Sequence, residues 1–420
     1  MKRFWKYSTC IAVVAMTILP ALTGNDNLLN AGEPPVKKDI LLTPGQRIML
    51  DNNNDFACNL FRSINEQKRG RGSFIVSPIS VSYMLGMLNE GADGNTRRQI
   101  SDVLGLGNDV HDINMYFKKM TDEAPRVDSK VAVKIANCID VNSRKGISLI
   151  PQFEADMRKY YSAQVDEMDF TTGGNVDIIN NWCKSKTQGM IPKILDKLDP
   201  EAAMYLLNAV YFKASWVWIF DPKETRDRSF TKEDGSTVKC MMMHRKSQAS
   251  YGKNDLCEML CMPYGSNGYS MYVLLPRMGK TVGDIIKNIS AKELKKQRTY
   301  EMSNHEVDIL IPRFTTENET DLTSVLSSMG MPLAFNERAA EFPNMALEHD
   351  DLYVSKMKQK AKIEVDEEGT KTAAVTVTEM RNRAAGPSSG YTFHATHPFV
   401  YYIIENSTGS IFFMGTYCGD

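Results

Sequence analysis

The sequence has no excess of charge of either sign and few histidines. Its 50 lysines and arginines are balanced by 51 aspartates and glutamates, which leaves a formal net charge of −1. This balance argues against a bulk electrostatic partner such as a nucleic acid or an anionic membrane. The six histidines show no metal-ligand spacing, and His394 and His397 have no third ligand nearby. We therefore expect no nucleic-acid partner, no metal and no cofactor.

A disulfide framework is also missing. Apart from Cys10, near the N-terminus, the cysteines are odd in number and widely scattered, and no CxxC motif occurs. Cys257 and Cys261 would lie roughly 13 Å apart along one strand, which is too far for a disulfide. We expect free thiols, which in an exported protein indicate a bacterial or anaerobic source.

No apolar run is long enough to span a membrane. The run from Ile11 to Leu22 follows a basic N-terminus and is shorter than the roughly 20 residues of a spanning helix. This pattern is typical of a cleaved secretory signal. It predicts a signal in residues 1–24, a polar tether in 25–45, and a secreted or extracytoplasmic location, in the periplasm or at the cell surface.

The rest of the chain has the composition of a globular domain, with 42% hydrophobic and 24% charged residues. Phe56, Leu60 and Ile64 recur at helical spacing and predict a helix over about 46–66. Ser77 and Pro78 are typical of the N-cap and first position of a second helix.

Strand-like segments gather in the second half of the chain. They are rich in Val, Ile, Phe and Tyr and cover residues 270–276, 306–314, 361–365, 398–405 and 410–417. The last two flank a hairpin signal at Asn406-Ser407-Thr408-Gly409. Helices early and strands late predict an α+β fold, with residues 46–420 as a single domain.

Two short motifs resemble enzyme sites but lack the required context. Gly386-Pro387-Ser388-Ser389-Gly390 fits the G-x-S-x-G nucleophile elbow, which needs a strand before it and a helix after it, whereas a polar loop precedes it here. The GKT at 279–281 lacks the earlier glycine of a phosphate-binding loop, because Leu274 stands at that position. We expect that the chain is not an enzyme, and a hydrolase that uses Ser388 is the remote alternative.

Several separate segments agree with one family. They include FIVSPISVSYMLGMLNEGADGNTRRQI (74–100), LLNAVYFKASWVWIF (206–220), DLTSVLSSMGM (321–331) and HPFVYYIIENSTGSIFFMG (397–415). In order and spacing they resemble the serpins, a family of serine protease inhibitors, from about residue 46 to the end. The resemblance implies a large mixed central sheet, smaller β-sheets, eight to nine helices, and an exposed reactive-centre loop at about 367–392.

The segment VDEEGTKTAAVTVTEMRNRAAGPSSG (365–390) reads as a strand joined to a soft loop. Between 370 and 381, even-numbered residues are small or moderately apolar, and the three charged residues fall on the odd-numbered face. Such a strand can enter the middle of a sheet. In the serpins it does so after cleavage, which implies an irreversible, suicide-type inhibitor. A non-inhibitory serpin, a protease substrate or binding protein, is the alternative.

The resemblance places the cleaved residue fourteen positions after the hinge glycine, Gly369, which gives Arg383 followed by Ala384. An arginine suits the acidic pocket of a trypsin-like protease. Arg381 and Met380 are alternative reactive residues, and Met380 would suit a chymotrypsin- or elastase-like enzyme. The expected partner is a trypsin-like serine protease, with an elastase-like enzyme as second candidate, and the inhibitor is expected to be a monomer.

Other roles carry over residue by residue. The resemblance implies a hinge made of Glu367, Glu368, Gly369, Thr370, Thr372, Ala373 and Ala374. It implies supporting positions beneath the sheet and at its opening, the shutter and the breach, at Ser77, Ser80, Asn208, Gln359 and Trp216. Three positions depart from the common pattern. Lys371 and Thr372 stand where many inhibitory serpins have Glu and Ala, and Gln359 replaces the usual histidine, so its amide is expected to bond a hydroxyl or an asparagine.

Overall fold

The computed structural model describes residues 37–107, 109–347, 352–370 and 390–420, all of which belong to one compact unit. Nine α-helices occur in these ranges: α1 (Pro44–Gln67), α2 (Pro78–Gly91), α3 (Gly94–Leu104), α4 (Val110–Glu123), α5 (Pro151–Tyr161), α6 (Asn175–Lys186), α7 (Val282–Asn288), α8 (Ala291–Lys296) and α9 (Leu322–Met329). None of these helices combines the length and apolar character that crossing a bilayer requires.

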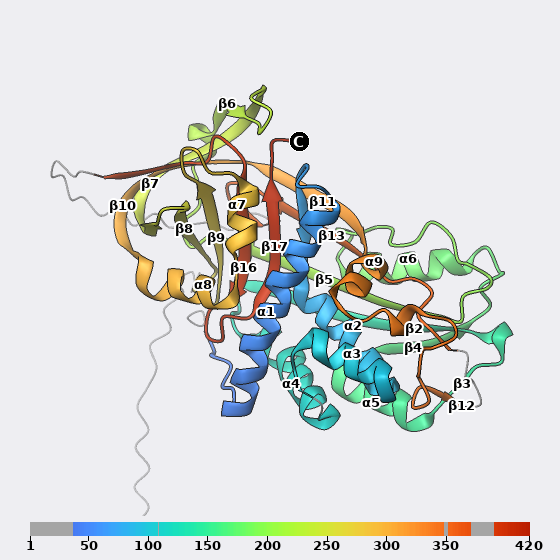
Figure 1. Ribbon diagram of the computed structural model, residues 1–420. Helices are drawn as coiled ribbons and strands as arrows, with labels where there is room; N and C mark the ends of the chain where they lie inside the picture. Colours follow the sequence, from blue (N-terminus) through green and yellow to red (C-terminus); the bar gives the residue numbers. More distant parts are fainter. Residues whose placement is uncertain (1–36, 108, 348–351, 371–389) are drawn as a thin grey trace, which may run out of the picture. The chain divides into compact units, whose positions relative to one another are not determined.

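A six-stranded mixed sheet carries the residues of interest (Figure 1). Its strand order is β11 (Phe314–Asp321), β13 (Lys358–Val365), β14 (Gly369–Thr370), β5 (Met204–Ser215), β2 (Val131–Asn142) and β4 (Gln164–Met168). β2 and β4 pair in parallel, whereas the other pairs are antiparallel.

A second, larger sheet packs beside it. Its order is β1 (Phe74–Val76), β17 (Ile411–Tyr417), β16 (Phe399–Glu405), β9 (Tyr269–Pro276), β8 (Cys257–Tyr264), β7 (Thr237–Lys253), β10 (Met302–Pro312) and β15 (Tyr391–His394), with β6 (Arg226–Thr231) also paired to β7. β3 (Ser148–Leu149) and β12 (Ala346–Leu347) form a small two-stranded sheet. The α+β class with a large mixed sheet is thus confirmed.

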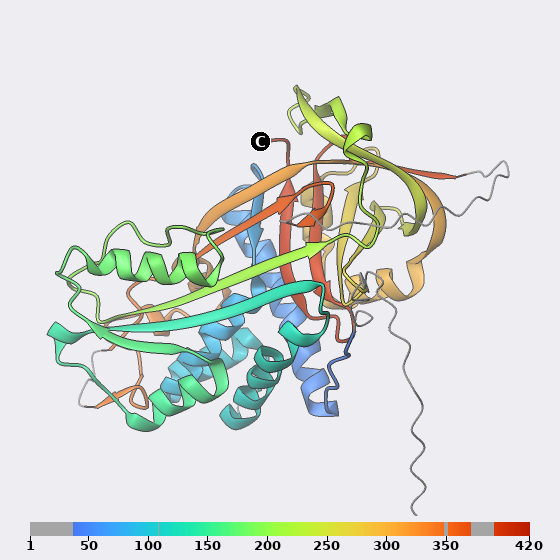
Figure 2. The same ribbon diagram turned by 180° about the vertical axis from the view of Figure 1, so that it is seen from behind.

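The two faces of β5 belong to two different cores. Its even-numbered residues, such as Leu206 and Phe212, join the main core, while Leu207 and Tyr211 join a second core. Ile179 and other residues of α6 complete that second core. Figure 2 shows α6 running along one side of the sheet. The alternation of a half-buried strand is therefore replaced by burial on both faces.

Local sequence patterns predicted the position of several elements correctly. The helix predicted over 46–66 begins at Pro44, behind a capping box in which the Thr43 hydroxyl accepts from the Gln46 backbone. The second helix begins at Pro78 as predicted. Its N-cap residue, Ser77, makes no side-chain cap bond, because its hydroxyl donates to the Phe412 carbonyl at 2.8 Å instead. The predicted hairpin joins β16 to β17.

Candidate functional site at the centre of the six-stranded sheet

The site is the region where β5 and β13 run beside each other. β14 lies between them, and its two residues are antiparallel to both flanking strands. Gly369 pairs with Ser215, and Thr370 pairs with Ala214 on one side and Val365 on the other. β5 has 12 residues and β13 has 8, yet no ladder in the described residues joins the two directly. We call the facing edges of β5 and β13 beyond Thr370 the slot.

Thr370 lies at the near end of the slot and is buried. Its residue is 1% exposed, and its hydroxyl shares a hydrogen bond of 2.7 Å with the Tyr264 hydroxyl. The Tyr264 ring stacks on Trp216 with centroids 4.3 Å apart. The Trp216 indole N–H donates to the Asp366 carbonyl at 2.9 Å. Two stacked aromatic residues therefore fix the point at which the chain enters the sheet.

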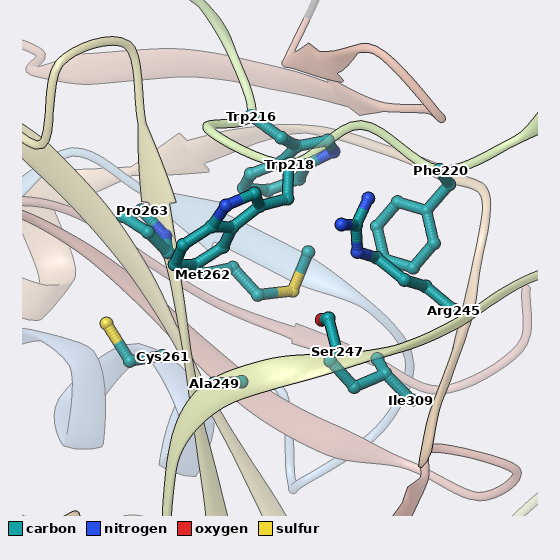
Figure 3. A pocket seen from close by; sticks show the side chains of 10 residues that line it. All are labelled: Trp216, Trp218, Phe220, Arg245, Ser247, Ala249, Cys261, Met262, Pro263 and Ile309. Carbon is teal, nitrogen blue, oxygen red and sulfur yellow. The ribbon is translucent and has the colours of Figure 1, made fainter. Parts of the chain in front are cut away.

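Trp216 also forms part of the wall of a small pocket beside this entry point. Figure 3 shows Trp216 and Trp218 near each other and the Arg245 guanidinium beside the Phe220 ring. Arg245 donates to the Ile219 carbonyl at 2.5 Å. Trp218 is 45% exposed, so the pocket opens to solvent while Trp216 stays buried. Trp216 therefore lines this pocket on one side and stacks on Tyr264.

The turn before β14 requires a glycine. The Asp366 carboxylate accepts hydrogen bonds from the backbone N–H groups of Glu368 (3.0 Å) and Gly369 (3.1 Å). Gly369 has φ +152°, and a Cβ there would lie 2.0 Å from the Ala214 carbonyl oxygen. Any other residue would be strained and would push β14 away from β5.

Glu367 is buried in the same turn and forms an ion pair with Arg313. Its residue is 5% exposed, and its carboxylate accepts from Arg313 through two contacts, at 2.6 and 3.2 Å. Burial acts to raise the pKa of Glu367, but the hydrogen bonds and charge of Arg313, together with the side chain of Thr225, outweigh it and the pKa is lowered. The ion pair ties the turn to residue 313, which lies between β10 and β11.

Polar side chains interrupt the apolar core further along the slot. The Gln359 amide accepts from the Ser77 N–H and donates to the Ser77 carbonyl, both at 2.9 Å, and the Ser80 hydroxyl donates to the Ser77 hydroxyl at 3.0 Å. On the opposite edge, Asn208 donates to the Asn137 side chain at 2.7 Å. The Asn208 Oδ1 atom is buried and has no hydrogen-bond partner among the described residues.

The structure thus brings together Trp216, Glu367, Glu368, Gly369 and Thr370 at one end of the slot. Further along lie the four predicted supporting residues, Ser77, Ser80, Asn208 and Gln359. The other predicted residues lie outside the described residues: Thr372, Ala373, Ala374, Met380, Arg381, Arg383 and Ala384.

Sequence reasoning missed Tyr264, Arg313 and Asp366. The only signal for Arg313 is that a buried glutamate such as Glu367 needs a cation, and nothing in the sequence says which cation.

Comparison with known proteins identifies the family. The profile of the family Serpin (serine protease inhibitor) matches residues 51–419. A leukocyte elastase inhibitor of Equus caballus is 32% identical over 383 residues, which cover 87% of this chain and 97% of that protein. The human protein serpin B8 is 32% identical over 371 residues, with 87% and 97% covered. The chain therefore belongs to the serpin family.

Solved structures agree with this assignment. The native state of the thermophilic serpin tengpin superposes with a TM-score of 0.81 at 30% identity, covering 92% of this chain and 98% of that one. Human thyroxine-binding globulin in complex with its ligand gives 0.79 at 27% identity, with 89% and 98% covered. The description of the family, serine protease inhibitor, does not name a catalyst, which agrees with the prediction that the chain is not an enzyme.

One prediction is wrong. The N-terminal pattern predicts a secreted or extracytoplasmic protein, but the similar proteins include serpins B6 and B8, which are intracellular and have no signal peptide. A basic stretch followed by a short apolar run is a local pattern, and a serpin domain neither requires nor excludes it. For this reason the pattern did not predict the location of the protein. Residues 1–36 lie outside the described residues.

The Glu367–Arg313 pair predicts a pH-dependent contribution to stability. A carboxylate whose pKa is lowered in the folded protein stabilises it above the unfolded value, about 4.3 for Glu, and this contribution is lost as the pH falls through the folded pKa. Glu367→Gln should therefore lower the free energy of unfolding at neutral pH by about 1–2 kcal/mol, since Arg313 is partly exposed. Urea unfolding of both proteins should show this difference shrinking below about pH 4. A difference that is constant with pH would contradict the assignment.

Proposed function

We propose that the protein is an irreversible, suicide-type inhibitor of trypsin-like serine proteases. The target protease cleaves the bond between Arg383 and Ala384, and the freed segment after Thr370 enters the slot between β5 and β13. The single observation that carries this proposal is the position of β14, which already starts a strand between two neighbours that share no ladder. Family membership supports protease inhibition in general, and Arg383 supports the trypsin-like class.

The register of β14 supports the insertion in detail. Thr370 lies between Val365 and Ala214, so in an inserted strand that keeps this register each further residue would pair with one residue further back on both flanking strands. Thr372 would then lie between Ile363 and Phe212, Ala374 between Ala361 and Val210, and Thr376 between Gln359 and Asn208. The inward face of the segment would then meet the main core, to which Ile363, Phe212, Ala361 and Val210 belong.

The same register gives Thr376 a specific role. Its hydroxyl would arrive beside Asn208, whose Oδ1 atom is buried without a partner among the described residues. A hydroxyl donates one hydrogen bond, and a buried acceptor left unpaired costs about 1–3 kcal/mol. Insertion would remove that cost.

Lys371, which stands where many inhibitory serpins have a glutamate, should have little effect on the free energy of insertion in this register. Lys371 would lie on the outer face between Glu364 and Lys213, one attractive and one repulsive neighbour. Thr372 would lie against the Phe212 ring and is the bulkier departure, because a β-branched residue replaces the usual alanine.

The energetics favour such a step. A strand of about 11 residues between two others gains on the order of 10 ladder hydrogen bonds at roughly 1 kcal/mol each. The sum is comparable to the stability of a whole domain. Before cleavage the far end of the segment is tied to β15, which is paired with β10, and this attachment opposes insertion.

We also propose a second target protease and an alternative function. An elastase-like enzyme is a second target, supported by the similarity to a protein named leukocyte elastase inhibitor and by Met380. A non-inhibitory binding protein is the alternative function, supported by the similarity to thyroxine-binding globulin.

The first test is whether a complex with trypsin survives in SDS. The wild-type protein should form a stoichiometric, SDS-stable complex, whereas Thr370→Arg should be cleaved and released. The reason is that Thr370 is already 1% exposed between β5 and β13 in the uncleaved protein, so an arginine there would either bury a charge, at a cost of several kcal/mol, or displace the start of the inserting strand. Thr370→Ser keeps the hydroxyl bonded to Tyr264 and serves as the control. Trapping by Thr370→Arg with unchanged stoichiometry would refute the insertion mechanism.

The second test compares intact protein with protein nicked in the loop. Cleavage within residues 381–384 should raise the melting temperature sharply, because the cut segment gains the ladder and packing of a central strand. Scanning calorimetry of both forms measures the difference. If the two forms melt together, the loop does not insert and the non-inhibitory alternative is favoured.

The third test concerns the reactive bond. Arg383→Ala should reduce the rate of trypsin inhibition by orders of magnitude, because a trypsin-like pocket loses its charge-assisted pair with a guanidinium. Arg381→Ala should have a much smaller effect, since its side chain reaches another subsite. Mass spectrometry of the released C-terminal fragment identifies the bond directly. A fragment that starts at Asn382 instead of Ala384 would make Arg381 the reactive residue.

A further inference from the structure

Three potential metal ligands meet at the edge of the six-stranded sheet, away from the slot. Cys138 and Asp140 lie two residues apart on β2, and Asp166 pairs with Asp140 across to β4. The Cys138 sulfur and one oxygen of each carboxylate all lie within 4.8 Å of one another. Cys138 belongs to the second core beneath α6, so the cluster lies on the face of the sheet that α6 covers (Figure 1).

Asp140 is a buried carboxylate without an adequate partner. Its residue is 1% exposed, and its only hydrogen bond in the described part of the chain comes from the Cys138 thiol, with 3.5 Å between sulfur and oxygen. A thiol is a weak donor. The neighbouring Asp166 carboxylate accepts from the Gln164 amide at 2.6 Å, and within the described residues neither carboxylate forms a salt bridge. Burying a charge in this way is costly unless a cation compensates it.

We propose that Cys138, Asp140 and Asp166 form a binding site for a divalent zinc-like cation. Zinc takes thiolate sulfur and carboxylate oxygen ligands in tetrahedral sites, and three protein ligands leave one position for water. Ligand atoms in such a site are separated by about 3.5 Å, given bond lengths of about 2.0–2.3 Å. The distance between the Cys138 sulfur and the Asp140 oxygen, 3.5 Å, already has this value, and the other ligand-atom distances are no longer than 4.8 Å.

The chemistry of the site selects the metal and provides an entry path. A thiolate ligand disfavours magnesium and calcium, which prefer oxygen alone. β4 is the edge strand and Asp166 is only half-buried, so a cation can reach the cluster from solvent past Asp166. Once bound, it would cross-link β2 to β4.

Protons and one lysine compete with the cation. Burial, assisted by the Asp166 charge, raises the pKa of Asp140 to about 7, while burial and Asp140 raise the pKa of the Cys138 thiol. Binding must displace these protons, so the affinity should rise with pH. Lys186 at the end of α6 acts on Cys138 in the opposite direction to Asp140, so its positive charge should weaken cation binding.

The test uses the full-length protein freed of metal with a chelator and held above the pKa of Asp140. Titration with zinc chloride by calorimetry should show one equivalent bound and a raised melting temperature. Cobalt chloride, as a probe for zinc, should give the near-ultraviolet charge-transfer band of a thiolate–cobalt bond. These measurements on the unmodified chain need no variant, so they stand even if a substitution in the cluster impairs folding.

Variants then locate the site. Cys138→Ser should abolish the cobalt band, whereas Cys183→Ser, a buried free cysteine in the same core, should retain it. Asp166→Asn, at the edge strand, should weaken zinc binding by at least about tenfold, and Lys186→Met should strengthen it. Absence of zinc binding by the unmodified chain would overturn the proposal. A cobalt band that persists in Cys138→Ser would overturn it equally.

Discussion

The structure depends on two neighbouring strands that do not bond to each other. β5 and β13 are joined only through the two residues of β14, and no ladder links them directly in the described residues. Backbone N–H and C=O groups inside a protein need partners, so a sheet with an unfilled central position has more to gain than a complete one. The rest of the site either starts a strand at this position or holds its sides in place.

The contacts at the entry to the slot hold the first two residues of a strand in place and do not extend further along it. Gly369 brings the backbone against Ala214 as no other residue could, and the Glu367–Arg313 pair anchors the turn before it. Thr370 is then fixed by its bond to Tyr264. These contacts act only on the turn and on the two residues of β14 that follow it. Whether the strand continues depends on the chain beyond Thr370, which is where the proposed cleavage would act.

Much of this arrangement could be predicted from local patterns. Helical spacing located α1, the Ser-Pro pair located α2, and the family motifs predicted the mixed sheet and the place of Gly369. The partners of these residues could not be predicted in the same way. Tyr264 lies 106 residues from Thr370 and Arg313 lies 54 from Glu367, and no periodicity links positions that far apart. Gln359 was expected to bond a hydroxyl or an asparagine, but both ends of its amide bond the Ser77 backbone, which offers a donor and an acceptor together.

One polar residue, Asn208, interrupts the apolar residues of β5. Asn208 stands between Leu206 and Val210 on the face toward the main core, where an apolar residue would cost less. Its side-chain N–H donates to Asn137, but its buried oxygen accepts no hydrogen bond from the residues that the structure describes. Such an atom destabilises the present arrangement by an amount comparable to one lost hydrogen bond. If a strand with a hydroxyl at this register fills the slot, the same atom stabilises the new arrangement. Under the proposed insertion, Asn208 therefore acts on the free-energy difference between the two states more than on either state alone.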